Sequence, residues 1–477
     1  MAARGIFSQA YLPVTLGLLS AIFGSAFDTT AVTAIMPRIA QDLGDVGAYP
    51  LTFAATYAAS VFGMVLAGLA SDRIGSIRTF GWSAGIMSIG LLLAVFAPTM
   101  SVFLISRAVQ GLGSGGLVVA IYAIIAEAYP NQLQQRMFAA FSGAYLIPSL
   151  IGPGLAGLVA EWATWHVVFL ATFAGIGFST SLVLTKARER ISATNSGRHV
   201  SGVSSATGAG PGSRTSWRTV LIAAGLALGA GLMNYASQLH LGVALPLFTA
   251  SLVLVLVTIR KLIPRGTLRA ARGVPRVIAS RGLFESLLTA EIYMPLLMAT
   301  VYGLDPSMTG LALSASGLTW FLGSEVQSRK FDALPTPLLF RIGAGVGGAG
   351  LCVCAITALA ELPWVLAVVG WGLTSLGMGF SYPRLCSLPM QLCRPNQIGF
   401  VSSAQQITAM TSMVAMISVA ALLQVGLPQQ IRFAAIYAVV AAVAALVWWL
   451  WNPRVTEPVP ESDVPWHSSP QRSQAAS

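Results

Sequence analysis

Apolar stretches of eighteen or more residues recur from one end of this 477-residue chain to the other. Each is long enough to cross the roughly 30 Å hydrocarbon core of a bilayer as a single helix. Only 9% of the residues are charged, whereas soluble domains carry roughly 25%. The sequence therefore predicts an all-α polytopic membrane protein that leaves little of the chain for an aqueous domain.

The apolar stretches predict about fourteen transmembrane helices in the order six, two and six. The first stretch is too long for the core of a signal peptide, so we expect it to be a retained span. The spans are predicted near 12–36, 50–70, 79–97, 101–127, 138–160, 166–185, 217–236, 241–259, 282–302, 307–327, 337–360, 363–383, 400–424 and 432–452.

This order divides the chain into five segments. A linker is expected where Ser, Gly, Thr and Arg dominate without apolar periodicity, and a polar tail follows the last span. The predicted segments are an N-terminal six-helix bundle (1–186), a flexible cytoplasmic linker (187–216), two inserted helices with a basic cytoplasmic loop (217–281), a C-terminal six-helix bundle (282–452) and a disordered cytoplasmic tail (453–477).

The distribution of basic residues predicts the orientation. The chain has 27 Lys and Arg, of which Arg38 and Arg432 fall in predicted external loops and Arg107 falls inside a span. The other 24 fall in segments that are cytoplasmic if both termini are inside, as the positive-inside rule requires. We therefore expect a multi-pass protein of a bacterial inner membrane. The net charge of +11 is explained by topology and by contact with membrane lipids, and no nucleic-acid partner is expected.

The segment 260–281 carries seven cationic residues and no acidic one. Arg265, Arg269, Arg272 and Arg276 recur at a spacing of three or four residues, which suits one face of a short helix on the anionic inner leaflet. An ordinary solvated loop that only sets the topology remains the alternative.

Charged and glycine residues close the second span. Asp72 and Arg73 follow Gly68 where the helix leaves the membrane, and Gly75 and Arg78 come next. Glycine permits close helix contact and a tight turn. We expect Asp72 to pair with a neighbouring helix end and to hold the cytoplasmic side shut. The alternative is an ordinary charged turn.

Two further segments interrupt apolar spans. Arg107 lies inside the fourth span, where a charge needs a buried partner or a water-filled cavity, although it could instead extend to an interface. The fifth span contains Gly152, Pro153, Gly154 and Gly157, which predict a bent and closely packed helix.

These segments lie on spans two, four and five in the order of the signature motifs of the major facilitator superfamily, which the whole chain resembles. The Gly-Pro segment resembles its antiporter motif. Residues 27–32 with 35–37 resemble the first-span signature of the fourteen-helix drug:proton antiporters, and 317–324 resemble actinobacterial members. Departures are Ser76 and Ile77 where further basic residues are usual, and His166 where arginine is usual. The resemblance implies two six-helix bundles plus two inserted helices, and export of amphipathic drugs or cations.

Buried carboxyl groups are the candidates for proton coupling. Asp28 lies ten residues before Arg38 and Glu291 ten residues after Arg281, so each is roughly 15 Å from a predicted boundary. Both are expected near the midplane, in the first span of each bundle. Asp28, Glu291, Glu285 and Arg107 form the predicted proton-coupling and substrate-binding set. Alternatively, one acid only pairs with Arg107 for stability.

The leading hypothesis is a secondary active transporter, a monomeric proton-coupled antiporter that binds a small amphipathic substrate and protons. No Walker loop is present, so no ATP-driven pumping is expected. Export of a lipid or native metabolite, and proton symport, are the alternatives. An enzyme is not expected, since the sequence has no HExxH motif and no histidine cluster within the spans. No cofactor or metal is predicted, and the proton gradient supplies the energy.

Overall fold

The computed structural model describes residues 5–9, 11–187, 217–331, 333–393 and 397–452, and all regular elements among them are helical. The elements are α1 (Leu12–Asp42), α2 (Tyr49–Ile74), α3 (Ser76–Val95), α4 (Met100–Ala128), α5 (Asn131–Trp162), α6 (Trp165–Leu182), the π-helical turn η1 (Val183–Ala187), α8 (Trp217–Ala236), α9 (Leu241–Ile259), the 3-10 turn η2 (Thr267–Arg269), α10 (Val274–Leu287), α11 (Thr289–Thr300), α12 (Pro306–Lys330), α13 (Thr336–Leu359), α14 (Trp364–Leu392), α15 (Ile398–Gly426) and α16 (Gln429–Leu450).

The prediction of an all-helical protein with about fourteen spans is confirmed. Within the described residues, thirteen segments are long and apolar enough to cross a membrane, with α10 and α11 forming one of them. The remaining long helix, α12, has 25 residues. It is long enough to cross a membrane, but it is more polar than the other thirteen segments. Helices suit this setting because each pairs its own backbone groups where no water is available.

The start of several helices follows from proline. Pro13, Pro50 and Pro306 lie in the first two positions of α1, α2 and α12, where the absent N–H has no intrahelical acceptor to lose. The turn from α2 to α3 is made by Gly75, whose φ is +87°. This backbone conformation favours glycine, so the predicted tight turn is present.

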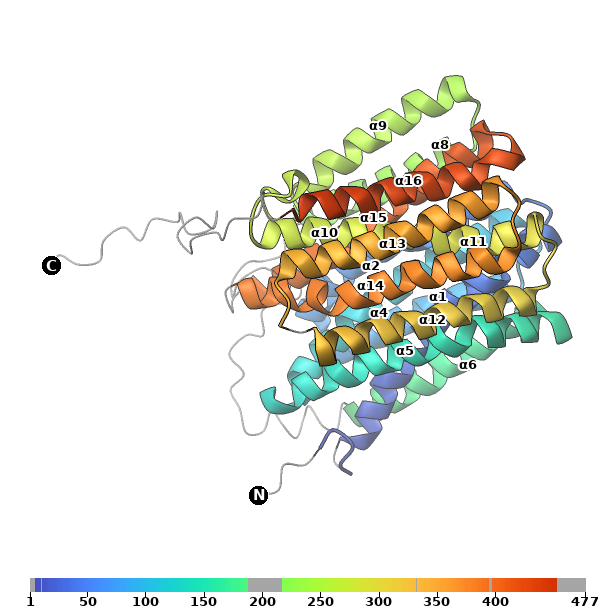
Figure 1. The fold of residues 1–477 in the computed structure, drawn as a ribbon. Coiled ribbons are helices and arrows are strands. Elements are labelled where there is room, and N and C mark those ends of the chain that lie inside the picture. Colours follow the sequence, from blue (N-terminus) through green and yellow to red (C-terminus); the bar gives the residue numbers. More distant parts are fainter. Residues whose placement is uncertain (1–4, 10, 188–216, 332, 394–396, 453–477) are drawn as a thin grey trace.

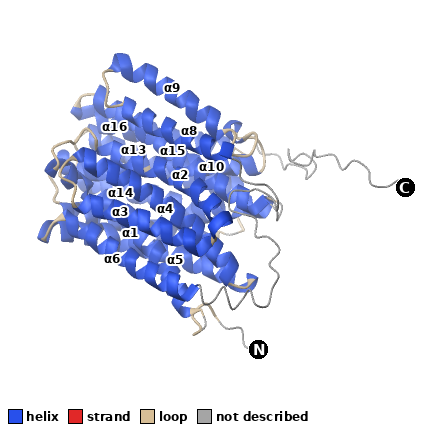
Figure 2. Cartoon of the chain, turned by 180° about the vertical axis from the view of Figure 1, so that it is seen from behind, coloured by secondary structure: helices blue, strands red, loops and turns tan. Residues whose placement is uncertain are grey.

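The long helices lie side by side in one bundle, as Figures 1 and 2 show. We call α1–α6 the N half and α10–α16 the C half. The two halves meet where α5 packs on α12, α2 on α15 and α1 on α11. We call the face where α1 begins and α16 ends the terminal face, and the other face the opposite face.

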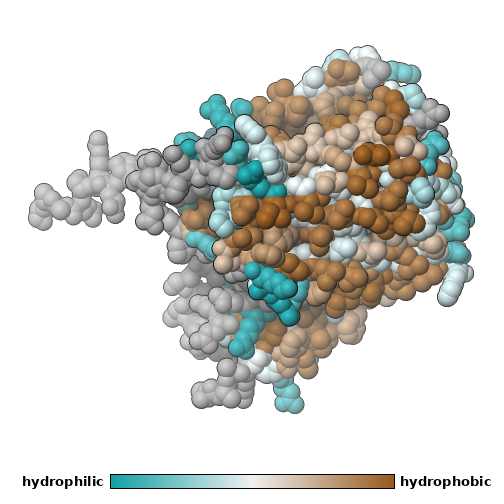
Figure 3. Space-filling view, in the orientation of Figure 1, coloured by the Kyte–Doolittle hydropathy of each residue, from teal (hydrophilic) through white to brown (hydrophobic). Residues whose placement is uncertain are grey.

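The inserted pair lies outside the two halves. α8 packs against α2 and α15, one helix from each half, and α9 packs mainly against α8 at the edge of the molecule (Figure 1). In the view of Figure 3, hydrophobic side chains cover the middle of the surface and hydrophilic ones gather toward its ends. This distribution is the one expected of a bundle surrounded by lipid.

The structure corrects the boundary predicted at residue 282. The span begins at Val274, so Arg276 and Arg281 lie inside α10 and are 8% and 6% exposed. Arg276 donates a hydrogen bond to the carbonyl of Ala270 at 3.2 Å, and its guanidinium lies 5.9 Å from the ring centre of Trp451. The span starts earlier because protein groups take the place of water around these two arginines.

The predicted surface helix in the basic segment is also corrected. Residues 260–273 form turns with only the 3-10 turn η2, and Arg265, Arg269 and Arg272 are exposed. The alternative of an ordinary basic loop agrees with this arrangement. The predicted linker lies outside the described residues from position 188 onward, as does the predicted tail 453–477. The five-segment division therefore stays a prediction.

Candidate functional site

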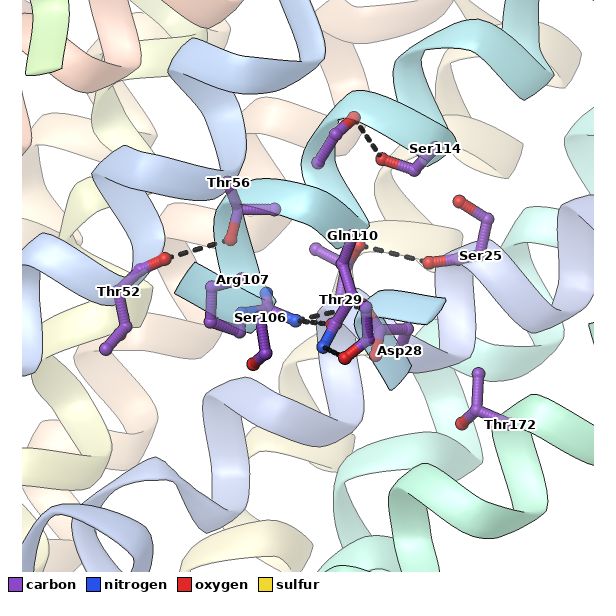
Figure 4. A network of polar contacts seen from close by, with 12 residues as sticks. Ser25, Asp28, Thr29, Thr52, Thr56, Ser106, Arg107, Gln110, Ser114 and Thr172 are labelled. Carbon is purple, nitrogen blue, oxygen red and sulfur yellow. Dashed lines mark hydrogen bonds and ion pairs between the residues drawn. The ribbon is translucent and has the colours of Figure 1, made fainter. Parts of the chain in front are cut away.

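Asp28 and Arg107 form a buried ion pair between α1 and α4. Arg107 Nη1 lies 3.1 Å from Asp28 Oδ2. Arg107 is 2% exposed and Asp28 is 5% exposed. The same nitrogen donates to Gln110 Oε1 at 2.5 Å, and Gln110 Nε2 donates to the carbonyl of Gly90 on α3 at 3.1 Å. Figure 4 shows the three side chains converging in the middle of the N half. The structure therefore places Arg107 in the interior, as the sequence predicted.

The glycines after Arg107 bring α4 into backbone contact with its neighbours. A Cβ atom on Gly111 would lie 2.1 Å from the carbonyl oxygen of Thr56, and one on Gly115 would lie 2.1 Å from that of Ser60. Both acceptor residues are on α2, so this face of α4 admits no side chain. The close packing fixes the depth of Arg107 and thereby its distance to Asp28.

The ion pair leaves one hydrogen-bonding atom of each partner unused. Among the described residues, Asp28 Oδ1 and Arg107 Nε are buried without a hydrogen-bond partner. A buried polar atom without a partner is uncommon in native structures. The pair can therefore exchange a proton or a partner without first breaking a saturated network.

A second ion pair lies in the C half. Arg281 Nε lies 3.2 Å from Glu285 Oε2 within α10. Across the contact with α14, Arg281 donates to the hydroxyl of Tyr382 and to Cys386 Sγ. Tyr382 in turn donates to Glu285 at 3.3 Å. Each half thus has a buried pair among its described residues: Asp28–Arg107 joins α1 to α4, whereas Arg281–Glu285 lies within α10 and is linked to α14 by hydrogen bonds.

Sequence reasoning missed the role of Arg281, because it used this residue to mark the membrane boundary. The i, i+4 spacing from Glu285 is the signal that could have identified the pair. Tyr382 had no such signal, since its contact depends on how α14 packs on α10.

Glu291 lies at an interrupted helix. α10 ends at Leu287 and α11 begins at Thr289, and Pro295 cannot donate to the carbonyl of Glu291. Within the described residues Glu291 takes part in no ion pair, and its side chain is partly exposed. It lies seventeen residues into the segment Val274–Thr300 and nine residues before its end, so its depth near the midplane stays a prediction. Glu285, eleven residues in, is nearer the middle.

Aromatic residues of the N half face these acids. Tyr57 on α2 and Tyr145 on α5 both lie within electrostatic range of Glu285 and Glu291. Tyr57 is also within range of Arg107. Tyr145 nevertheless keeps 46% of its surface exposed. Tyr57 and Glu291 are partly exposed as well.

The predicted antiporter-motif segment is the contact between α5 and its neighbours. A Cβ on Gly157 would lie 2.3 Å from the carbonyl oxygen of Pro306, and the Gly154 amide donates to Ser314 Oγ on α12 at 3.0 Å. Gly152 faces α1, where its Cβ would lie 2.8 Å from Thr30 Oγ1. Pro153 lies inside α5, close to α12. Through this motif, α5 therefore packs against α1 of its own half and against α12 of the C half.

A further contact joins the halves near the opposite face. The hydroxyl of Tyr49, in the first turn of α2, donates to the carbonyl of Ile292 on α11 at 2.5 Å. Together with the Gly157–Pro306 contact, it holds the two halves against each other in the opposite-face part of the bundle. The structure is therefore closed at that face.

The residues of the predicted gate lie at the terminal face. Gly68 is buried in α2, while Asp72, Arg73 and Arg78 are exposed around the turn at Gly75. Beside this turn, Ser76 donates to Glu127 Oε2 on α4 at 2.6 Å. The turn is thus attached to α4, and the gating role of Asp72 stays a prediction.

Comparisons with known proteins agree with this architecture. Residues 18–418 match the family model described as Major Facilitator Superfamily. Over 401 residues the chain is 24% identical to a probable multidrug-efflux transporter of Mycobacterium tuberculosis, covering 79% of each protein. It is 34% identical to Multidrug resistance protein 3 of Bacillus subtilis over 156 residues, which are 33% of this chain and only 30% of that relative.

Solved structures show the same fold. A POT family transporter in complex with a thioalcohol conjugated peptide superimposes with a TM-score of 0.69 at 16% identity, covering 93% of this chain and 97% of that one. The D-xylose-proton symporter gives a TM-score of 0.67 at 15% identity, covering 94% and 99%. Since the family model spans most of the residues that build both halves, the chain belongs to the Major Facilitator Superfamily of membrane transporters.

Proposed function

We propose that this transporter is a proton-coupled antiporter that exports amphipathic drugs or organic cations by alternating access. The observation that carries the proposal is the position of Glu291. Within the described residues it is a carboxyl group in no ion pair, at an interrupted helix, and it lies near Tyr57 and Tyr145 of the N half. An ionisable side chain in a membrane span is costly and marks a transport pathway, and interrupted helices commonly form binding sites in transporters.

Antiport follows from competition for this carboxyl group. Glu291 can hold either a proton or a cationic group, and both remove the negative charge that disfavours a dry, closed site. Tyr57 and Tyr145 offer ring faces that attract an organic cation. A proton entering from outside would displace the substrate, and the gradient would supply about 1.4 kcal/mol per pH unit for each proton.

In the same proposal, Asp28 has a different role from that of Glu291. Its charge is compensated by Arg107 at 3.1 Å, so protonation of Asp28 would leave the guanidinium without its counter-ion. Arg107 would then move toward another acceptor, which alters the packing between α1 and α4. Asp28 is thus suited to couple protonation to the shape of the N half, while Glu291 is suited to contact the substrate.

The orientation in the proposal places the terminal face in the cytoplasm. The buried positions of Arg276 and Arg281 remove two residues from the cytoplasmic loops that the sequence had counted. Among the described residues, the remaining basic ones still lie almost entirely at the terminal face, whereas Arg38 and Arg432 are at the opposite one. The closed face is then the external one.

The test is transport in proteoliposomes with an imposed pH gradient. The substrates are ethidium as a planar cation and an uncharged dye of similar size. Wild type should accumulate ethidium against its gradient, and Glu291→Gln should bind and move it only poorly and without pH dependence. Asp28→Asn should lose uphill transport.

The matched control is Glu325→Gln. Glu325 is a span carboxylate paired with Arg329 at the exposed end of α12, and its substitution should leave coupling intact. Retention of uphill, pH-dependent transport by both Glu291→Gln and Asp28→Asn would reject these carboxyl groups as coupling sites. Transport of the uncharged dye alone would reject the cation as substrate.

A further inference from the structure

The inserted helix α8 lies across one of the lines along which the two halves meet. It packs against α2 of the N half and against α15 of the C half. Both of these helices also contact each other, so α8 covers their contact from the lipid side. Any motion that separates α2 from α15 at the opposite face must change the contacts of α8.

Polar side chains at the end of α8 reach both halves. Asn234 Nδ2 donates to Ser418 Oγ on α15 at 3.3 Å, and both residues are 0% exposed. Gln238, just after the end of α8, donates through Nε2 to the carbonyl of Gly47 in the α1–α2 loop at 3.0 Å. The two hydrogen bonds thus connect the C half and the N half through one short segment.

Asn234 is an unusual residue for simple anchoring in lipid. Its Oδ1 is buried without a partner in the described part of the chain, and burying an unpaired polar atom is unfavourable. Ser418 Oγ already donates to the carbonyl of Val414 at 2.8 Å, so it accepts from Asn234. A leucine at this position would avoid the cost of burying an unpaired polar atom. A single modest hydrogen bond is, however, well suited to form and break repeatedly.

The junction beneath Gln238 is incompletely packed. A cavity of about 200 Å³ lies there, lined by Gly47 and Pro50 of the N half, by Gln238, and by Ala421, Gln424 and Arg432 of the C half. Side chains that line such a cavity have no neighbouring atoms on one side, so they lose dispersion attraction there. Packing between the halves is therefore reduced at this point.

We propose that α8 is a reversible clamp on the opposite face: it moves with α2, and its Asn234–Ser418 hydrogen bond holds the C half only while that face is closed. α8 packs more extensively on α2 than on α15, which makes the Ser418 contact the one that breaks. This inference rests on the alternating-access part of the proposed function. It requires neither proton coupling nor a particular substrate.

The first experiment measures opening at the opposite face. Spin labels are attached at Phe96→Cys and Leu359→Cys, two residues that are 76% and 60% exposed and end α3 and α13 at that face. The parent has its four native cysteines replaced and is first shown to transport. The distance between the two spin labels is measured by double electron–electron resonance in lipid nanodiscs, without substrate or pH gradient.

Asn234→Leu and Ser418→Ala should each raise the ratio of open to closed protein by about two- to ten-fold, as expected for loss of one hydrogen bond. The matched control is Leu228→Ala on α8, a residue that is 59% exposed and takes part in neither hydrogen bond. Ser418→Ala is the milder change and decides the matter if Asn234→Leu fails to fold. An unchanged distance distribution in Ser418→Ala would overturn the clamp.

The second experiment distinguishes which half α8 follows. A short reducible crosslink is introduced between Asn234→Cys and Ser418→Cys, or between Gly47→Cys and Gln238→Cys. The first crosslink should abolish transport until it is reduced, and the second should leave most transport intact. Full transport with the first crosslink in place would overturn the proposal.

The two proposals can fail separately. If the wild type shows no pH-dependent uphill transport but the variants still shift the distances, the coupling is rejected and the clamp is kept. Unchanged distances in Ser418→Ala, with coupling abolished in Glu291→Gln, would reject the clamp alone.

Discussion

The guanidinium of Arg107 lies 3.1 Å from the carboxylate of Asp28, although 79 residues separate them in the chain. Neither side chain contacts bulk solvent to any extent, and α4 is held at this depth by backbone contact with α2. The pair therefore has to be understood as a part of the N half's core as well as a candidate proton site. These two roles lead to different expectations for the two partners.

Asp28→Asn should destabilise the protein more than Arg107→Gln does. Removing one partner of a buried pair typically costs about 3–5 kcal/mol, because the other charge is left uncompensated. A lone Asp28 can become neutral by binding a proton, whereas a lone Arg107 cannot lose one. Unfolding in a detergent series would give the two free energies.

The double variant Asp28→Asn with Arg107→Gln should be less destabilised than the sum of the single ones. The control pair is Glu325 and Arg329, which is exposed and should contribute less than about 1 kcal/mol. Additive effects at Asp28 and Arg107 would show that the pair has no coupling energy.

Gly157→Ala should weaken the contact between α5 and α12. The new Cβ would lie 2.3 Å from the carbonyl oxygen of Pro306, so the helices must separate, at a cost of about 1–3 kcal/mol typical of overpacking. The melting temperature in detergent should fall. Gly143→Ala is the control on the same helix, since nothing lies within 4 Å of its added Cβ. Equal melting temperatures for the two variants would contradict the packing role of the motif.

Tyr49→Phe should open the opposite face more often. The substitution removes the hydroxyl that donates to Ile292 across the halves and keeps the ring, so the equilibrium should shift about two- to ten-fold. The readout is the labelling rate of Ala299→Cys, which lines a cavity of about 190 Å³ at that face, by an impermeant thiol reagent.

Tyr437→Phe serves as the control for Tyr49→Phe. The Tyr437 hydroxyl contacts Met294 Sδ at 3.8 Å, and both residues belong to the C half, so its loss should leave the labelling rate unchanged. A labelling rate in Tyr49→Phe equal to that of the parent would mean that this hydrogen bond does not hold the face closed.

The orientation predicts which exposed residues are reached from outside the cell. Lys330 ends α12 at the terminal face, whereas Glu361 follows α13 at the opposite face, and both are exposed. In intact cells an impermeant reagent should label Glu361→Cys and spare Lys330→Cys until the membrane is permeabilised. The reverse pattern would invert the topology.

The helical bundle and its approximate spans were predictable because they depend on local properties. A run of about twenty apolar residues must satisfy its own backbone groups in lipid, and a helix does so without help from distant residues. Proline at the start of α12 and glycine at residue 75 mark helix boundaries for equally local reasons. The burial of Arg107 also followed locally, since a charge within a span requires shelter.

The partners of buried charges depended on tertiary structure. Charge counting assigned Arg281 to the membrane boundary, but Tyr382 and Cys386 on α14 and Glu285 in its own helix allow it to lie within the span. No local pattern could show that α14 would supply those groups.

The sequence by itself therefore determined that this chain is a bundle of membrane-spanning helices with costly charges inside it. The tertiary structure decided which charges are compensated, namely Asp28 by Arg107 and Glu285 by Arg281, and that Glu291 stays outside any ion pair among the described residues. It also decided that α8 contacts both halves. The physical reason is that apolar burial and helix formation act along the chain, whereas ion pairs require the final distance between side chains on different helices.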